Sequence, residues 1–181
     1  MRKALFLAVM ITLVAAVSAQ AAAEKIAIFN SRAVAANSEP LINASKKVNN
    51  QYLPEKQKLE TQNKALQKQA EELQKQRAAI SREAYAEKNE AFMRAKRNFE
   101  DAYQSYGRKV EAALLRVDQE FTGRLVQAVQ EYGMRKNYAA VIDVIAGGVI
   151  YHDKSVDVTD DIIKEVARAY KENKPLPGQK K

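Results

Sequence analysis

The sequence contains no cysteine. Disulfides therefore cannot stabilise the fold, and a lipid anchor attached to a cysteine at a cleavage site is excluded. Only one histidine is present, His152, so we expect neither a transition-metal site nor a Cys/His catalytic pair. The stability of the fold must then come from packing or from assembly with other chains.

Motifs that bind phosphate or build a nucleophilic site are also missing from the sequence. There is no G-x-S-x-G, P-loop or G-x-G-x-x-G pattern, and Gly147-Gly148 alone indicates a turn. The His152-Asp153 pair is typical of a solvated surface, and Glu71-Glu72 and Asp160-Asp161 are typical of a solvated helix face and a helix cap. We therefore predict a protein that is not an enzyme and holds no cofactor or metal ion.

Long apolar runs are scarce, and the longest one opens the chain. Arg2 and Lys3 precede an apolar stretch at 4–17, and small residues follow it. This order predicts a signal peptide over residues 1–23, cleaved after Ala21 or Ala23. The alternative, an uncleaved anchor, is disfavoured because a bilayer span needs about 20 apolar residues. We expect export across the inner membrane to the periplasm.

The charge of the chain is basic. The formal net charge is +8, and removing a signal with two cations leaves about +6. In an exported protein, lipopolysaccharide, anionic lipid or acidic polypeptide is a more plausible counterpart than nucleic acid, and we expect no nucleic acid partner. The alternative is that the charge only keeps the protein soluble.

Glycine and proline are rare in the middle of the chain, which is rich in helix-forming residues. We expect a helical segment over residues 39–132, with Ser38 as its N-cap and Pro40 in its first turn. Pro54 predicts a kink or a restart. No glycine or proline interrupts residues 55–106.

Large apolar residues in this segment repeat every seven residues in two series, but the phase breaks between them. One shape that fits is a single rod of about 135 Å, and the other is a helical hairpin with its tip near residues 81–84. The hairpin is favoured because it pairs an aliphatic with an aromatic series and returns the chain to its start. The predicted seam comprises Leu59, Leu66, Leu73, Ile80, Tyr85, Phe92, Phe99 and Tyr106.

The two ends of the chain carry strand signals. We expect strands at 25–29, at 138–145 (buried on both faces) and at 149–151, and a helix N-capped by Thr159. Residues 24–38 and 133–172 would form one small β-rich body, with residues 173–181 disordered. The fold class is α+β and mostly α. Because this body is small, we expect it to oligomerise through Ile26, Ile28, Val141, Ile142, Val144, Ile145, Val149 and Ile150.

The helical arm carries many cations among its acids. Some should form i,i+4 pairs such as Glu60–Lys64 and Glu71–Lys75 on a solvated face. The functional interpretation is that the arm presents a flexible basic surface, which binds a polypeptide or lipid electrostatically. The candidate contact residues are Lys64, Lys68, Lys75, Arg77, Arg82, Lys88, Arg94, Lys96 and Arg97.

The whole mature sequence resembles the Skp (OmpH) family of periplasmic chaperones. The resemblance lies in Lys25-Ile-Ala-Ile-Phe-Asn30, in the long Gln/Lys/Glu-rich middle, in Ala140-Val-Ile-Asp-Val144 and in Asp157-Val-Thr-Asp160. It implies a homotrimer whose hairpins surround a cavity, and ATP-independent capture of unfolded outer-membrane proteins. Basic surface in this family is also linked to lipopolysaccharide and anionic lipid. Pro54 and the Lys/Pro-rich tail depart from the family pattern.

Two other functions remain open from the sequence. A coiled-coil scaffold in the envelope would form a rod and would not protect unfolded proteins. A nucleic-acid binder would fit the sequence pI of about 9.5, but export and the lack of a DNA-binding motif argue against it.

Overall fold

The computed structural model describes residues 25–173 and residue 176. The predicted signal peptide, residues 1–23, lies outside these residues. Of the predicted tail, only Asn173 and Leu176 are described. The elements are β1 (Ile26–Phe29), α2 (Ser31–Asn37), α3 (Glu39–Gln76), α4 (Arg82–Lys136), β2 (Ala140–Asp143), the 3₁₀ helix η1 (Lys154–Val156) and α5 (Thr159–Glu172).

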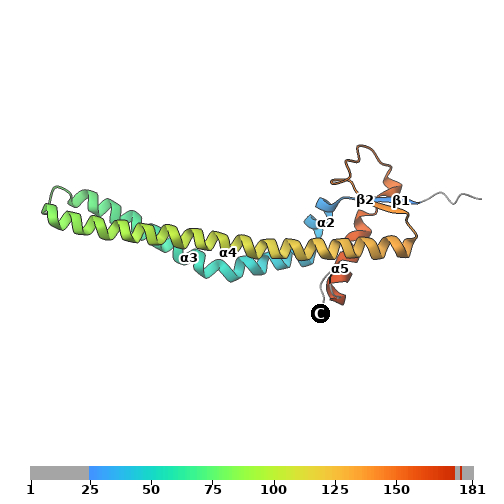
Figure 1. The fold of residues 1–181 in the computed structure, drawn as a ribbon, viewed down its shortest axis with the longest axis horizontal. Coiled ribbons are helices and arrows are strands. Elements are labelled where there is room, and N and C mark those ends of the chain that lie inside the picture. Colours follow the sequence, from blue (N-terminus) through green and yellow to red (C-terminus); the bar gives the residue numbers. More distant parts are fainter. Residues whose placement is uncertain (1–24, 174–175, 177–181) are drawn as a thin grey trace, which may run out of the picture.

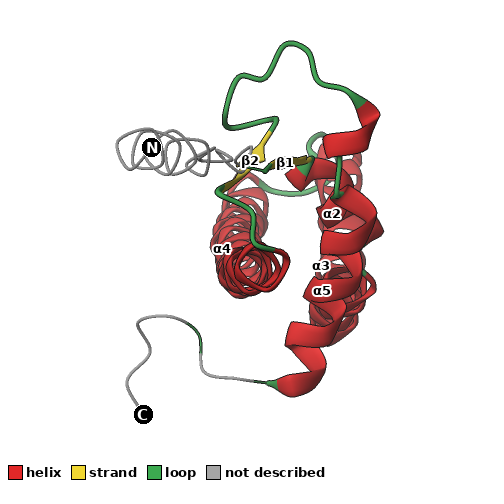
Figure 2. Ribbon diagram, turned by 90° about the vertical axis from the view of Figure 1, so that its right-hand side faces the viewer, coloured by secondary structure: helices red, strands yellow, loops and turns green. Residues whose placement is uncertain are grey.

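Helices α3 and α4 form one long hairpin that projects from a small body (Figure 1). They contain 38 and 55 residues, which at 1.5 Å per residue gives lengths of about 57 and 82 Å. The two helices run alongside each other from the body to the tip in Figure 1, and Figure 2 looks along the arm from the body end. The hairpin prediction is confirmed, and the single rod is excluded.

The tip of the hairpin lies a few residues earlier than predicted. The turn occupies residues 77–81, whereas 82–84 already form the first turn of α4. Helix α4 begins here because the Ser81 side chain accepts a hydrogen bond from the Ala84 N–H at 3.2 Å, as an N-cap does. At the other side, the N–H groups of Ala79 and Ile80 both donate to the Gln76 carbonyl. These bonds close the turn without glycine, proline or asparagine.

Helix α3 stays helical across Pro54, so the predicted restart does not occur. Proline inside a helix has no N–H to donate to the carbonyl four residues earlier, that of Asn50, and it crowds that carbonyl. The cost is about 3 kcal/mol. The packing of α4 along α3 offsets this cost.

The arm is part of the connection between the two strands of the sheet. Strands β1 and β2 pair in parallel, with Ile26 opposite Ala140 and Phe29 opposite Asp143. Parallel strands need a long crossover connection. In this chain the crossover is α2 together with the entire α3–α4 hairpin. The two chain ends therefore meet in one body, as the sequence predicts.

The core of the body lies where α2, α4 and α5 pack together beneath β1. Val34, Ile162 and Val166 are fully buried, and Phe121 and Leu125 of α4 join them. The last turns of α4 thus belong to the body, and the predicted arm boundary at residue 132 is too late. At the end of α4 the Tyr132 hydroxyl donates to Asp161 Oδ2 at 2.8 Å. Burial and this carboxylate raise the pKa of Tyr132 well above its usual value.

The strand predictions for the second half of the chain are wrong in extent. Strand β2 covers only Ala140–Asp143, and its residues are half-buried rather than buried on both faces. Residues 144–148 form a turn, where a Cβ at Gly147 would lie 2.7 Å from the Ile142 side chain and 2.8 Å from the Asp143 carbonyl oxygen. Residues 149–151 form no strand, and within residues 25–173 the sheet consists of β1 and β2 alone.

Two caps also differ from the prediction. Helix α5 begins at Thr159, so Val158 is its N-cap residue, and the Thr159 hydroxyl instead accepts from the Asn30 N–H at 3.0 Å. Ser38 does precede α3, but its side chain makes no capping bond and is buried. Before it lies the short helix α2, which the sequence analysis missed although Asn30 caps it through the Ala33 N–H.

The carboxylate of Asp143 joins β2 to α2, and it predicts a pH dependence. Burial raises its pKa, but the hydrogen bonds that it accepts from Ser31, Ile145 and Ala146 outweigh burial, and the net pKa lies below the usual 3.8. The charged form therefore stabilises the fold above about pH 3.8, and this contribution disappears as the pH falls through the lowered pKa.

We expect Asp143→Asn to lower the free energy of unfolding at pH 7 and to have a smaller effect at pH 3. Urea denaturation at both pH values measures the difference. An equal loss of stability at the two pH values would show that the charge of Asp143 does not matter.

Candidate functional site

Most of the arm lies outside the core of the body, and few apolar side chains pack between its two helices. Leu73 and Phe92 lie on opposite helices and line one cavity of about 250 Å³. Leu66 and Phe99 line a second cavity of about 280 Å³. The rest of both linings is polar residues and alanine, so each cavity contains a single aliphatic–aromatic pair between the helices. Such a seam gives about half the apolar packing of an ordinary coiled coil.

At its two ends the seam differs from the predicted pairing. Ile80 lies in the turn rather than in a helix, and Tyr85 is half-buried in the first turns of α4. Leu59 is buried, but the Tyr106 ring packs edge-on against Tyr52, with ring centroids 6.4 Å apart. Sequence analysis did not name Tyr52, although it lies seven residues before Leu59 and continues the first series.

Two polar contacts also cross between the helices. Lys109 Nζ lies 2.9 Å from Glu55 Oε1 in the proximal half of the arm. Nearer the tip, Lys88 Nζ donates to Gln76 Oε1 at 2.6 Å. Both contacts are exposed, and an exposed pair of this kind contributes about 0–1 kcal/mol. They therefore add little to the stability of the hairpin.

Three of the arm cations are occupied by ion pairs along their own helix. Arg94 pairs with Glu90, Lys96 with Glu100, and Lys56 with Glu60. Glu60 therefore pairs with Lys56, four residues before it, and not with Lys64, four residues after it. The predicted Glu71–Lys75 pair does not form either.

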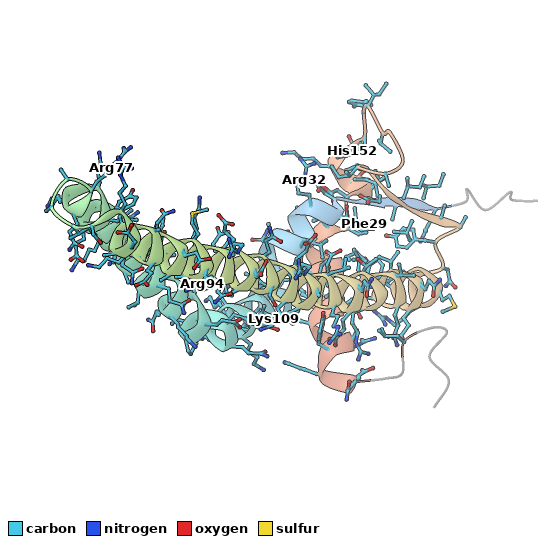
Figure 3. All side chains as sticks on the ribbon, turned by 60° about the vertical axis from the view of Figure 1, so that its left-hand side comes forward. Phe29, Arg32, Arg77, Arg94, Lys109 and His152 are labelled. Carbon is cyan, nitrogen blue, oxygen red and sulfur yellow. The ribbon has the colours of Figure 1, made fainter. Side chains whose placement is uncertain are left out.

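The remaining predicted cations have no ion-pair partner among residues 25–173, and Lys88 has only the Gln76 contact. They lie on both helices from mid-arm to the tip, where Figure 3 places Arg77, while Arg94 lies farther down the arm. The distal arm thus presents unpaired positive charge beside a thin seam. These residues are Lys64, Lys68, Lys75, Arg77, Arg82 and Arg97.

The residues predicted to form the oligomerisation body divide into two groups in the single chain. Ile28 is buried in the core, and Val141, Ile142, Val144 and Val149 are half-buried. The others are exposed: Ile26 by 49%, Ile145 by 49% and Ile150 by 101%. Tyr151, which was not among the residues predicted to form the oligomerisation surface, is 83% exposed beside Ile150.

A cavity of about 610 Å³ opens between α2, α4 and the end of β2. Its lining is mostly apolar, with Phe29, Phe121 and Leu125 at its base, and Val126 and Ile145 at its exposed edge. The body thus has an open apolar face on the side of the sheet. Figure 3 labels Arg32 and Phe29 there, below the loop that carries His152.

Between residues 25 and 173, no cluster of three or more His, Asp or Glu could hold a metal ion. None of the helices in that range has an apolar stretch long enough to cross a bilayer. His152 contacts the Asp153 carbonyl oxygen at 3.4 Å, and the Asp153 side chain caps η1 through the Ser155 N–H.

Sequence comparison identifies the family. A sequence model of outer membrane proteins of the OmpH-like type matches residues 25–166, which span β1 to α5. The chain belongs to the OmpH-like family.

A solved structure also shares the fold. A crystal structure from Caulobacter crescentus, of a protein proposed to be an OmpH-like outer membrane chaperone, is similar to this chain with a TM-score of 0.64. The sequences are 19% identical, and the match covers 80% of this chain and 85% of the other. No protein of curated function matches this chain. The OmpH-like fold, a long helical hairpin on a small body, is thus shared with a distant relative.

Proposed function

We propose that this OmpH-like chain is an ATP-independent holdase that binds unfolded outer-membrane proteins and prevents their aggregation before membrane insertion. The observation that supports this most strongly is the arm itself. Two helices of 38 and 55 residues extend far beyond the core that they stabilise. An arm of this length offers a large surface, which suits the binding of large polypeptides of different sequence.

The physical properties of the arm suit an unfolded client. Its cations are distributed over two helices, and many of them have no ion-pair partner within the described chain. Each contact with a client would be weak, but several together retain the client while each breaks separately. Release then needs no ATP. We propose that the arm provides no catalytic group and no cofactor.

We also propose that the body assembles as a homotrimer, so that three arms surround the client. The number three comes from the resemblance to the Skp family. The need for a partner is supported by Ile150 and Tyr151, which lie almost fully in solvent. It is also supported by β2, whose only ladder partner within residues 25–173 is β1. A strand or loop of another copy would cover these groups.

The location that fits this function is the periplasm. The predicted signal peptide would direct export to it and would then be cleaved. There the unpaired arm cations would meet lipopolysaccharide or anionic lipid as additional partners. We propose no role in nucleic acid binding.

An aggregation assay tests the holdase proposal. An outer-membrane β-barrel protein is diluted from urea into buffer without ATP, and its light scattering is followed with and without this protein. The proposal predicts that scattering is suppressed at a stoichiometric ratio. Unchanged aggregation would favour a structural scaffold in the envelope instead.

The unpaired arm cations should dominate the electrostatic part of client binding. We expect the triple variant Lys64→Gln, Arg77→Gln, Arg82→Gln to bind an unfolded barrel protein about tenfold more weakly. Each lost contact is worth roughly 0.5 kcal/mol at an exposed site. The loss should be larger at low salt, because salt screens such contacts. Fluorescence titration at two salt concentrations measures the affinity.

The matched control neutralises three cations that already have partners: Lys56→Gln, Arg94→Gln, Lys96→Gln. It changes the net charge by the same amount and should weaken binding less. If both triple variants lost the same affinity at every salt concentration, the unpaired cations would have no special role.

A further inference from the structure

Three residues at the C-terminal end of the described chain contact two consecutive residues of α4. The Tyr170 ring lies beside the Arg124 guanidinium, whose Cζ is 5.7 Å from the ring centroid. Asn173 Oδ1 accepts a hydrogen bond from Arg124 Nη2 at 3.0 Å, and Leu176 lies against Gly123. The end of α5 and the chain just beyond it are therefore joined to α4 at one place, where α5 crosses α4 in the body (Figure 1).

The contact with Leu176 accounts for the glycine at position 123. A Cβ at Gly123 would lie 3.1 Å from Leu176 Cδ1 and 3.2 Å from Leu176 Cδ2, closer than ordinary van der Waals contact between carbon atoms. Glycine is a poor helix former, so its place inside α4 needs a reason. Gly107 of the same helix has no such reason, since a Cβ there would meet no atom within 4 Å. Gly123 thus leaves a notch in α4 that a leucine side chain fills.

The chain turns toward α4 at Asn173. This residue ends α5 in the left-handed conformation, with φ 45° and ψ 37°, which asparagine adopts more readily than most residues. Its partner Arg124 is only 5% exposed, so the contact lies within the packed body. Proline flanks Leu176 on both sides in the sequence, at Pro175 and Pro177. Each proline fixes one backbone φ angle, which lowers the conformational entropy lost when the leucine docks.

We propose that the notch at Gly123 is a docking site for the C-terminal segment of the chain, residues 174–181, with Leu176 as its anchor. The sequence pattern alone predicts disorder for this segment. Docking would instead restrain it beside α4, near the base of the arm. The segment carries three lysines. In terms of the proposed function, on which this consequence alone rests, the restrained lysines would add to the basic surface that binds a client.

Distance measurements between two spin labels test the docking directly. The chain has no cysteine, so Lys136→Cys at the end of α4 and Gly178→Cys in the C-terminal segment can be labelled without side reactions. Lys136 is exposed and lies about 20 Å along α4 from Gly123. Labelled protein is mixed with an excess of unlabelled protein, so that each assembly holds one labelled chain. Without client, we expect a single narrow peak, and a broad distribution in the native chain would overturn the proposal.

Leu176→Asp should replace the peak with a broad distribution, because burying a carboxylate against the helix without a partner is costly. Gln179→Asp is the control, since it changes the net charge of the same segment equally and should keep the peak. Gly123→Leu fills the notch from the helix and should also broaden the distribution, whereas Gly107→Leu should not. Leu176 lies beyond α5, so Leu176→Asp keeps the test valid even if Gly123→Leu fails to fold. An unchanged peak in Leu176→Asp, or equal broadening by Gln179→Asp, would overturn the docking site.

Client binding tests the consequence separately. Neutralising two of the lysines by Lys180→Gln, Lys181→Gln should weaken the binding of an unfolded barrel protein about twofold to fivefold in the native chain, as expected for two exposed charge contacts. The loss should be much smaller in the Leu176→Asp background, and equal losses would show that docking does not position these lysines. The labels report docking without any client, so a narrow native peak with no suppression of aggregation would disprove the proposed function and leave the docking site in place.

Discussion

Replacing Ile162 with alanine is expected to destabilise the body by about 2–5 kcal/mol, the usual range for truncating a fully buried isoleucine. Ile162 is 0% exposed and lies among α2, α4 and α5, where Val34, Phe121 and Val166 belong to the same core. The body is small, so this core has little stability to lose. Urea denaturation at fixed protein concentration measures the loss, with hydrogen exchange in α5 to distinguish the body from the arm.

Ile163→Ala is the matched control on the next residue of the same helix. Ile163 is only partly buried against the core, so its truncation should cost clearly less than that of Ile162. The arm seam should not respond to either change. If both variants lost the same stability, the core would not be centred on the α5 face that Ile162, Val166 and Ala169 form.

Replacing Ile150 with aspartate is expected to dissociate the proposed homotrimer while each chain keeps its fold. Ile150 is fully exposed in the single chain, and a substitution at such a surface position changes chain stability by no more than about 0.5 kcal/mol. If assembly buries it, each copy loses about 1.5–3 kcal/mol of apolar burial. In a closed assembly every copy carries the substitution, so the losses add up. Size-exclusion chromatography with light scattering measures the mass.

Met93→Asp is the control, since Met93 is also an exposed apolar residue, 40% in solvent, but lies on the arm far from the body. It should leave the mass of the assembly unchanged. An Ile150→Asp variant with the same mass as the native protein would show that the loop after β2 plays no part in assembly.

The long arm could be predicted from the sequence because its signals are local. The seven-residue repeats of Leu66, Leu73, Phe92 and Phe99 predict two apolar stripes, and their mirror order favours a reversal of the chain between them over a single rod. The turn lies a few residues before its predicted position because the local signal for it is a single capping residue, Ser81, whose hydroxyl accepts a hydrogen bond from the Ala84 N–H. The seven-residue periodicity contains no information about such a cap, so it could not locate the turn to the residue.

The body was harder to predict because its structure depends on contacts between distant segments. Residues 149–151 are β-branched or aromatic, which indicates a strand, but strand formation needs a neighbouring strand, and none pairs with them among residues 25–173. The parallel pairing of Ile26 with Ala140 has no local signature, since it joins segments separated by the whole arm. Likewise, Tyr52 and Lys109 contact their partners only because of the hairpin register, which the sequence pattern leaves open.

The mass of a complex with an unfolded client tests the central claim most directly. This protein is mixed with an outer-membrane barrel protein diluted from urea, without ATP, and the soluble complex is measured by native mass spectrometry. The account predicts one client chain held by three copies of this protein. A client bound by a single copy, or a client that aggregates and leaves this protein uncomplexed, would contradict the account.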